Sequence, residues 1–120
     1  MAAYNWIVFR EACPKCGNDA LIRAQCHVAS SFDGDNTGRF CQREYRLGAR
    51  MKWWDKSDDR YDTWKTTAGT VRPSPGNEDV VERCDADCPA CGAELFALIG
   101  FRDITPANVL GLEQNCSAGN

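Results

Sequence analysis

One short sequence occurs twice in the chain and constrains its fold more than any other feature. The two copies are Cys13-Pro14-Lys15-Cys16-Gly17 and Cys88-Pro89-Ala90-Cys91-Gly92, one in each half of the chain. Two thiolates separated by two residues can hold one tetrahedral cation, and the following glycine allows the left-handed turn that folds the backbone around the sulfurs. The copies together supply four thiolates, so we predict as metal ligands Cys13, Cys16, Cys88 and Cys91.

The paired C-P-x-C-G units resemble the knuckles of zinc ribbon and rubredoxin-like domains. The resemblance rests on the residues of the two motifs alone. It implies a small antiparallel sheet whose knuckles share one Zn²⁺ per chain, in preference to iron. A site of four cysteine ligands has no open coordination position, which is typical of structural rather than catalytic zinc. The ion would close the long loop between Cys16 and Cys88 and so couple metal binding to folding.

Length and charge favour one domain with an acidic second half. The chain has 120 residues and a net charge of −3; residues 1–54 carry eight Lys or Arg against five Asp or Glu, whereas residues 55–120 carry six against twelve. An acidic chain is a poor general binder of duplex nucleic acid. We expect a single domain over residues 1–112, with an insertion at about residues 30–79, followed by a flexible tail at 113–120.

The N-terminal sequence and the cysteine spacing favour a reducing compartment. The first six residues lack a basic segment followed by an apolar run, and no stretch of the chain approaches the length of a membrane span, so we expect a cytoplasmic protein. Eight cysteines could form four disulfides in a secreted scaffold. Two matching C-P-x-C-G units without a signal segment are better explained as thiolate ligands.

Alternating apolar residues predict a mainly β fold built around the two knuckles. Strands are expected at residues 4–11, 21–28, 80–83 and 95–101, so that each knuckle joins two strands. Residues 45–54 also alternate and favour a strand over a helix, residues 30–38 favour a loop, and residues 55–79 favour a long polar excursion. Thr105-Pro106 is typical of a helix start and predicts a short helix to about Leu112.

Three cysteines and the histidine raise the question of a second metal site. Cys84 precedes the second knuckle by four positions and could compete as a ligand or combine with Cys26, His27 and Cys41. Adjacent residues on a regular strand point to opposite faces, so Cys26 and His27 would not serve one ion together. We expect Cys26 and Cys41 to be buried as small apolar residues and His27 to be exposed without a ligand role.

Enzyme motifs are incomplete, which favours a non-catalytic protein. The string from Trp6 to Cys16 resembles the entry to the active site of glutaredoxin-type oxidoreductases, but that fold needs a helix after the CxxC, where this chain has turn residues and an alternating strand. Zinc deaminases need an H-x-E motif, which does not occur here. No nucleophile elbow or phosphate-binding loop is present either.

The remaining functional candidates lie on the surface. If residues 45–54 form a strand, Trp54 shares one side with cations, an arrangement that suits an anionic partner. The alternative is that the insertion covers Trp54 and the cations are simply solvated. We therefore expect a small zinc-binding adaptor that contacts another protein, with single-stranded nucleic acid binding and rubredoxin-like electron transfer as alternatives. The candidate partner-binding residues are Arg46, Arg50, Lys52 and Trp54.

Overall fold

Two β-hairpins, each closed by one C-P-x-C-G knuckle, form the centre of the molecule. A computed structural model describes residues 3–66, 71–73 and 76–115. The first hairpin pairs β1 (Asn5–Ala12) with β2 (Asp19–Cys26), and the second pairs β7 (Val80–Asp87) with β8 (Glu94–Arg102). The strands predicted on both sides of each knuckle are confirmed. The hairpins also correspond in sequence, since β7 and β8 begin at the same offset from β1 and β2 that separates the two knuckles.

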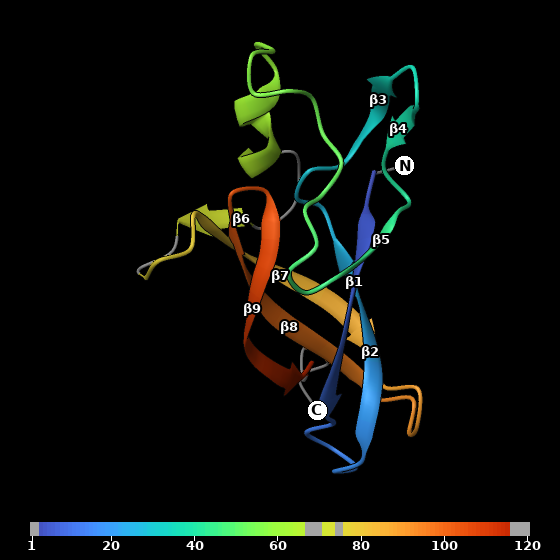
Figure 1. Cartoon of the computed structure of the whole chain (residues 1–120). Helices are drawn as coiled ribbons and strands as arrows, with labels where there is room; N and C mark the ends of the chain where they lie inside the picture. The colour runs from blue at the N-terminus through green and yellow to red at the C-terminus, as the bar shows by residue number, and fades with distance from the viewer. Residues whose placement is uncertain (1–2, 67–70, 74–75, 116–120) are drawn as a thin grey trace.

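Sheet topology brings the two knuckles to the same end of the molecule. β2 and β7 are neighbours in the order β5-β1-β2-β7-β8-β9, and they run antiparallel with Gln25 opposite Asp85. Their hairpin turns therefore lie together at the lower end of the sheet in Figure 1, far from the β3–β4 hairpin. This arrangement converts two distant sequence motifs into one cluster of cysteines.

The predicted C-terminal helix is wrong, because residues 105–112 belong to a strand. β9 (Thr105–Gln114) pairs with β8 along its length, from Arg102 opposite Thr105 to Leu95 opposite Gln114. Asp103 and Ile104 have positive φ angles of 51° and 57°, which turn the chain sharply back along β8. Pro106 is tolerated because β9 is an outer strand and its pairing shifts register at this point.

The insertion contains more regular structure at its start, and less in its middle, than the sequence suggests. The predicted loop at 30–38 contains most of a hairpin formed by β3 (Ser31–Asp35) and β4 (Gly38–Phe40). The predicted strand at 45–54 is wrong beyond Arg46, because only β5 (Glu44–Arg46) pairs, in parallel, with β1. A 3-10 helix, η1 (Tyr61–Thr66), and β6 (Val71–Pro73), which pairs with β7, complete the insertion.

After β5 the chain turns and crosses to the start of β9 instead of continuing as a strand. Gly48 has a φ of 88°, and the N–H groups of Gly48 and Met51 donate to the carbonyls of Pro106 and Ile104. Met51 and Trp53 are nevertheless buried while Lys52 and Trp54 are partly exposed, so the alternation in the sequence does mark inward and outward positions. Glu113 and Gln114, the first residues of the predicted tail at 113–120, belong to β9, and residues 116–120 lie outside the described residues.

The inward faces of both hairpins share one apolar core. Ile7, Ile22, Ile99 and Phe101 are fully buried, and Trp64 from η1 packs into the same cluster with 1% of its surface exposed. The carbonyl of Trp64 accepts the N–H of Ala29, which ties η1 to the turn after β2. Among the described residues, no helix is long and apolar enough to cross a membrane.

Candidate metal centre and surrounding surface

The two knuckles have the same backbone geometry. The N–H of Gly17 donates to the carbonyl of Cys13 at 2.9 Å, and the N–H of Gly92 donates to the carbonyl of Cys88 at 2.8 Å. Both glycines have a φ of 76°, a conformation that other residues adopt only with strain. The repeated C-P-x-C-G sequence thus encodes two copies of one tight turn, each of which directs two thiols to the same side.

Four sulfurs from the two knuckles form a cluster of the size that zinc requires. The Sγ atoms of Cys13 and Cys91 are 3.8 Å apart, those of Cys16 and Cys88 are 3.9 Å apart, and all four lie within 4.8 Å of one another. Zinc binds cysteine sulfur at about 2.3 Å, which gives a tetrahedron with edges of about 3.8 Å. The sulfurs therefore fit a four-cysteine zinc site, and the predicted residues Cys13, Cys16, Cys88 and Cys91 are brought together.

The cluster is buried on one side and open on the other. Cys13 and Cys88, the first cysteines of the knuckles, are 2% and 1% exposed and belong to the core. Cys16 is partly exposed and Cys91 is exposed. An ion at this position would bridge the core and the surface, and it would link the β1–β2 hairpin to the β7–β8 hairpin.

Backbone donors favour negative charge on part of the cluster. The N–H of Cys16, then that of Lys15, lowers the pKa of Cys13 to about 6, against the opposing effect of burial. The N–H of Ala93 lowers the pKa of Cys91, but partial desolvation of the sulfur and hydrogen bonds with the other three sulfurs outweigh it and raise that pKa to about 11. Four thiolates so close together repel one another, and a divalent cation would relieve that repulsion.

The described cysteines are all free thiols, so no disulfide occurs among the residues that the structure describes. The sulfur separations in the cluster are much longer than the roughly 2.05 Å of a disulfide bond. Cys116 lies outside the described part of the chain. The choice of thiolate ligands over disulfides therefore agrees with the arrangement of the four clustered cysteines.

A second group of potential ligands lies deeper in the sheet. The sulfurs of Cys26 and Cys84 and a carboxylate oxygen of Glu82 lie within 4.8 Å of one another, and all three residues are 0% exposed. Cys26 and Cys41 are buried as predicted, but Cys41 is not part of this group. The prediction that His27 is exposed is wrong: its side chain is 23% exposed, and its Nδ1 lies 3.1 Å from Oε2 of Glu82.

Glu82 is the functional candidate that the sequence did not reveal. Its carboxylate accepts the backbone N–H of His27 at 2.9 Å and 3.1 Å and the N–H of Val28 at 3.2 Å. These donors lie just beyond the end of β2, where the strand no longer pairs with β7. Hydrogen bonding to Glu82 raises the pKa of His27, and burial raises the pKa of Cys26 well above its ordinary value. The one available sequence signal was that Glu82 and Cys84, two positions apart, share a strand face.

The predicted partner-binding cations are mostly paired with acidic residues. Nη1 of Arg50 lies 3.4 Å from a carboxylate oxygen of Asp103, and Nζ of Lys52 lies 3.0 Å from Oδ2 of Asp35. Arg46 is exposed at the end of β5. The four predicted residues do not lie on one strand, and a binding role for them stays a prediction.

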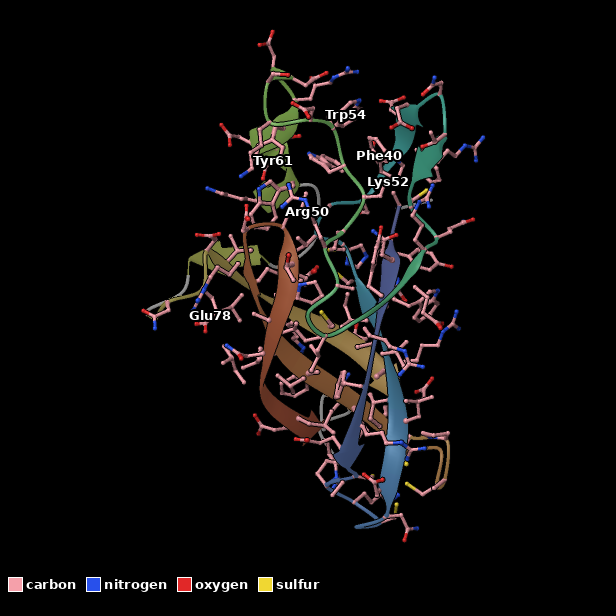
Figure 2. All side chains as sticks on the ribbon, viewed as in Figure 1. Phe40, Arg50, Lys52, Trp54, Tyr61 and Glu78 are labelled. Carbon is pink, nitrogen blue, oxygen red and sulfur yellow. The ribbon has the colours of Figure 1, made fainter. Side chains whose placement is uncertain are left out.

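Trp54 is half-buried in an aromatic cluster at the end of the molecule opposite the knuckles. Its ring centroid is 4.8 Å from that of Phe40 and 4.7 Å from that of Trp53, with edge-on geometry, and the Arg60 guanidinium lies 4.3 Å from it. Figure 2 shows Trp54, Phe40 and Lys52 gathered between η1 and the β3–β4 hairpin. The insertion therefore covers much of Trp54, as in the alternative that the sequence left open.

A cavity of about 300 Å³ lies on another part of the surface, between the two hairpins. Its lining includes Trp6 and Arg23 from the first hairpin, and Asp85 and Glu94 from the second. Arg23 stacks 4.2 Å from the Trp6 ring and pairs with Glu44 at 2.7 Å. The lining contains neither cysteine nor histidine, so the cavity is separate from both groups of potential metal ligands.

Comparison with known proteins adds no relative. No family model matches the chain. No curated protein matches it, and no solved structure matches it. The candidate function therefore depends on the geometry of the two cysteine groups and on the surface around them.

Proposed function

We propose that the chain is a small non-catalytic zinc protein that uses its surface to bind another protein. One zinc ion, held by Cys13, Cys16, Cys88 and Cys91, would fasten the two hairpins together. The observation that carries this proposal is the sulfur cluster, whose edges of 3.8 Å and 3.9 Å match those of a tetrahedral zinc–thiolate site. Four protein ligands saturate zinc and leave no position for a substrate, which assigns the ion a structural role.

A protein partner has more support than a nucleic acid. Two of the cations proposed for the partner face already pair with acidic residues, and the net charge of −3 opposes binding to phosphates. Large apolar side chains that remain 38–49% exposed provide contact area for a protein: Leu21, Phe32, Leu47 and Leu110. The protein would thus act as a metal-stabilised adaptor.

Electron transfer through iron is the second candidate. Two backbone N–H groups donate to Sγ of Cys13, from Lys15 at 3.3 Å and from Cys16 at 3.5 Å. Hydrogen bonds to cysteine sulfur are one of the means by which proteins set the reduction potential of iron sites. The same four sulfurs suit iron in ligand type, so a rubredoxin-like electron carrier is the competing function.

The identity of the bound metal distinguishes the adaptor role from electron transfer. We would measure the metal content and visible absorption of the chain purified without added metal, beside a Cys13→Ala/Cys16→Ala variant. The expected result is zinc without colour, with one equivalent fewer in the variant than in the native chain. Iron with visible charge-transfer absorption would replace the adaptor proposal with electron transfer, and an unchanged metal content in the variant would rule out the four-cysteine site.

The partner requires a separate experiment. The zinc-loaded chain and an Arg46→Ala/Arg50→Ala variant would be used to capture partners at low and at high salt. A protein captured by the native chain and lost with the variant would support the adaptor role. Capture of single-stranded nucleic acid, with affinity that falls steeply as salt rises, would contradict it.

A further inference from the structure

Cys26 and Cys84 face each other across the junction of the two hairpins. Gln25 pairs with Asp85 in the antiparallel contact between β2 and β7, so the next two residues, Cys26 and Cys84, lie opposite each other. Both side chains are 0% exposed and belong to the core. Opposed residues on neighbouring strands have Cβ atoms about 5 Å apart, a separation that one metal ion can bridge.

Glu82 adds a third potential ligand on the same face. It lies two positions before Cys84 on β7, and a carboxylate oxygen of Glu82 lies within 4.8 Å of both sulfurs. A fully buried carboxylate is unusual without a cation or several hydrogen bonds. Here Nδ1 of His27, 3.1 Å from Oε2, and two backbone N–H groups hold the carboxylate in place.

The two cysteines can exist in both a protonated and a metal-bound form. Without an ion, the thiol of Cys26 donates to the carbonyl of Val28 at 3.7 Å, and that of Cys84 donates to the carbonyl of Glu82 at 3.7 Å. A divalent ion that binds both sulfurs displaces two protons, so that two thiols and M²⁺ give a bis-thiolate complex and two H⁺. The charge of the buried group is the same before and after this exchange, which avoids the cost of adding net charge to the core.

We propose that Cys26, Glu82 and Cys84 form a second binding site for a thiophilic divalent cation of the zinc type. This site would hold the β2–β7 junction from inside the core, while the four-cysteine site holds the hairpin turns at the end of the sheet. His27 is a positioning residue that fixes the Glu82 carboxylate, in the manner of the outer hydrogen bonds around metal ligands. The chain then binds two ions, and the second site does not depend on the proposed function of the first.

Refolding with ¹¹³Cd²⁺ tests this proposal on the full chain. Because the site is buried, the protein is first unfolded and then refolded with excess ¹¹³Cd²⁺. Unbound metal is removed before the bound metal per chain is measured. We expect two equivalents and two ¹¹³Cd resonances, since the shift depends on the number of thiolate ligands. One resonance should match a four-thiolate site and the other a site with two thiolates. A single equivalent with a single resonance overturns the second site without the need for any variant.

Variants assign the resonances and keep the two sites distinguishable. Cys26→Ala/Cys84→Ala, checked for folding by circular dichroism, should lose one equivalent and the two-thiolate resonance only. Cys13→Ala/Cys16→Ala should lose the four-thiolate resonance only. This variant therefore tests the four-cysteine site separately from the second site. Cys41→Ala removes another buried thiol and serves as the matched control, with both resonances unchanged. Two equivalents retained after the loss of Cys26 and Cys84 would overturn the proposal.

Discussion

Gly17 and Gly92 have the same φ of 76° although they lie in opposite halves of the chain. The equivalence continues beyond the knuckles, because Ala29 and Ile104, which are separated by the same offset in sequence, both have positive φ angles, of 52° and 57°. The two halves of the metal site therefore belong to larger repeated units of strand, knuckle, strand and sharp turn. Two equivalent units that meet at β2 and β7 place four sulfurs around one point.

Replacing either knuckle glycine with alanine should destabilise the protein by a similar amount. A Cβ at Gly17 or at Gly92 would meet nothing within 4 Å, so the cost comes from the positive φ rather than from a clash. We expect each substitution to lower the free energy of unfolding by about 1–2 kcal/mol, the usual strain of a left-handed alanine. Denaturant unfolding in saturating zinc would measure the change.

Gly111→Ala is the matched control. Its Cβ would also meet nothing within 4 Å, but no positive φ occurs at that position on β9. We expect a change below about 0.5 kcal/mol, or slight stabilisation from the smaller entropy of the unfolded chain. Equal losses at Gly111 and Gly17 would mean that the knuckle geometry is not the source of the effect.

Removal of the metal should destabilise both hairpins together. Binding of an ion at about 1,000 times its Kd stabilises the folded state by about 4 kcal/mol, which a chelator would remove. Cys16→Ser should reproduce most of that loss, because it breaks the link between Cys16 and Cys88 across 72 positions of the chain. Thermal unfolding with and without chelator measures it. Cys41→Ser changes a thiol outside both groups, and the chelator should destabilise this variant as much as it destabilises the native chain. An unfolding temperature of the native chain that does not change with chelator would contradict a structural ion.

The strands next to the knuckles were predictable because their signals are local. Alternation in residues 21–28 and the β-branched or aromatic runs at Trp6–Phe9 and Leu95–Phe101 coincide with β2, β1 and β8. The cysteine pairing was predictable too, since a half-site of two thiols needs a second half-site. These features depend on residues a few positions apart, where sequence patterns carry most information.

Features that depend on distant partners were not predictable in the same way. Thr105-Pro106 is typical of a helix start, yet pairing with the central strand β8 outweighs that local preference. Residues 47–54 alternate as a strand does, but they cross to β9 instead of extending β5. The sequence does not distinguish Glu82 from other polar residues on a short strand, because its role depends on N–H groups from the end of β2.

Glu82→Gln should cost much more than a comparable change on the surface. The carboxylate accepts hydrogen bonds only, whereas a glutamine would turn an NH₂ group toward donors or leave a donor unpaired. We expect a loss of about 2–4 kcal/mol, in the range for a buried charged group that loses its hydrogen bonds. Urea unfolding at fixed pH and metal concentration measures it. Glu44→Gln, which breaks an exposed pair with Arg23, should cost under about 1 kcal/mol, and equal effects would show that Glu82 is not a structural anchor.

Trp54→Ala distinguishes a packing role from an exposed binding role for the aromatic cluster. Truncation of a fully buried tryptophan costs about 3–5 kcal/mol, so the half-buried ring, packed on Phe40 and beneath Arg60, should cost about 2 kcal/mol. Trp64→Ala, at a site 1% exposed, sets the upper limit in the same denaturant experiment. A loss of free energy of unfolding no larger than that of an ordinary surface substitution, about 0.5 kcal/mol, would mean that the Trp54 ring does not pack against its neighbours. Trp54 would then again be a candidate for partner binding. A loss of the expected size leaves Arg46 as the more informative residue for partner binding, because it is exposed and can be changed without disturbing that packing.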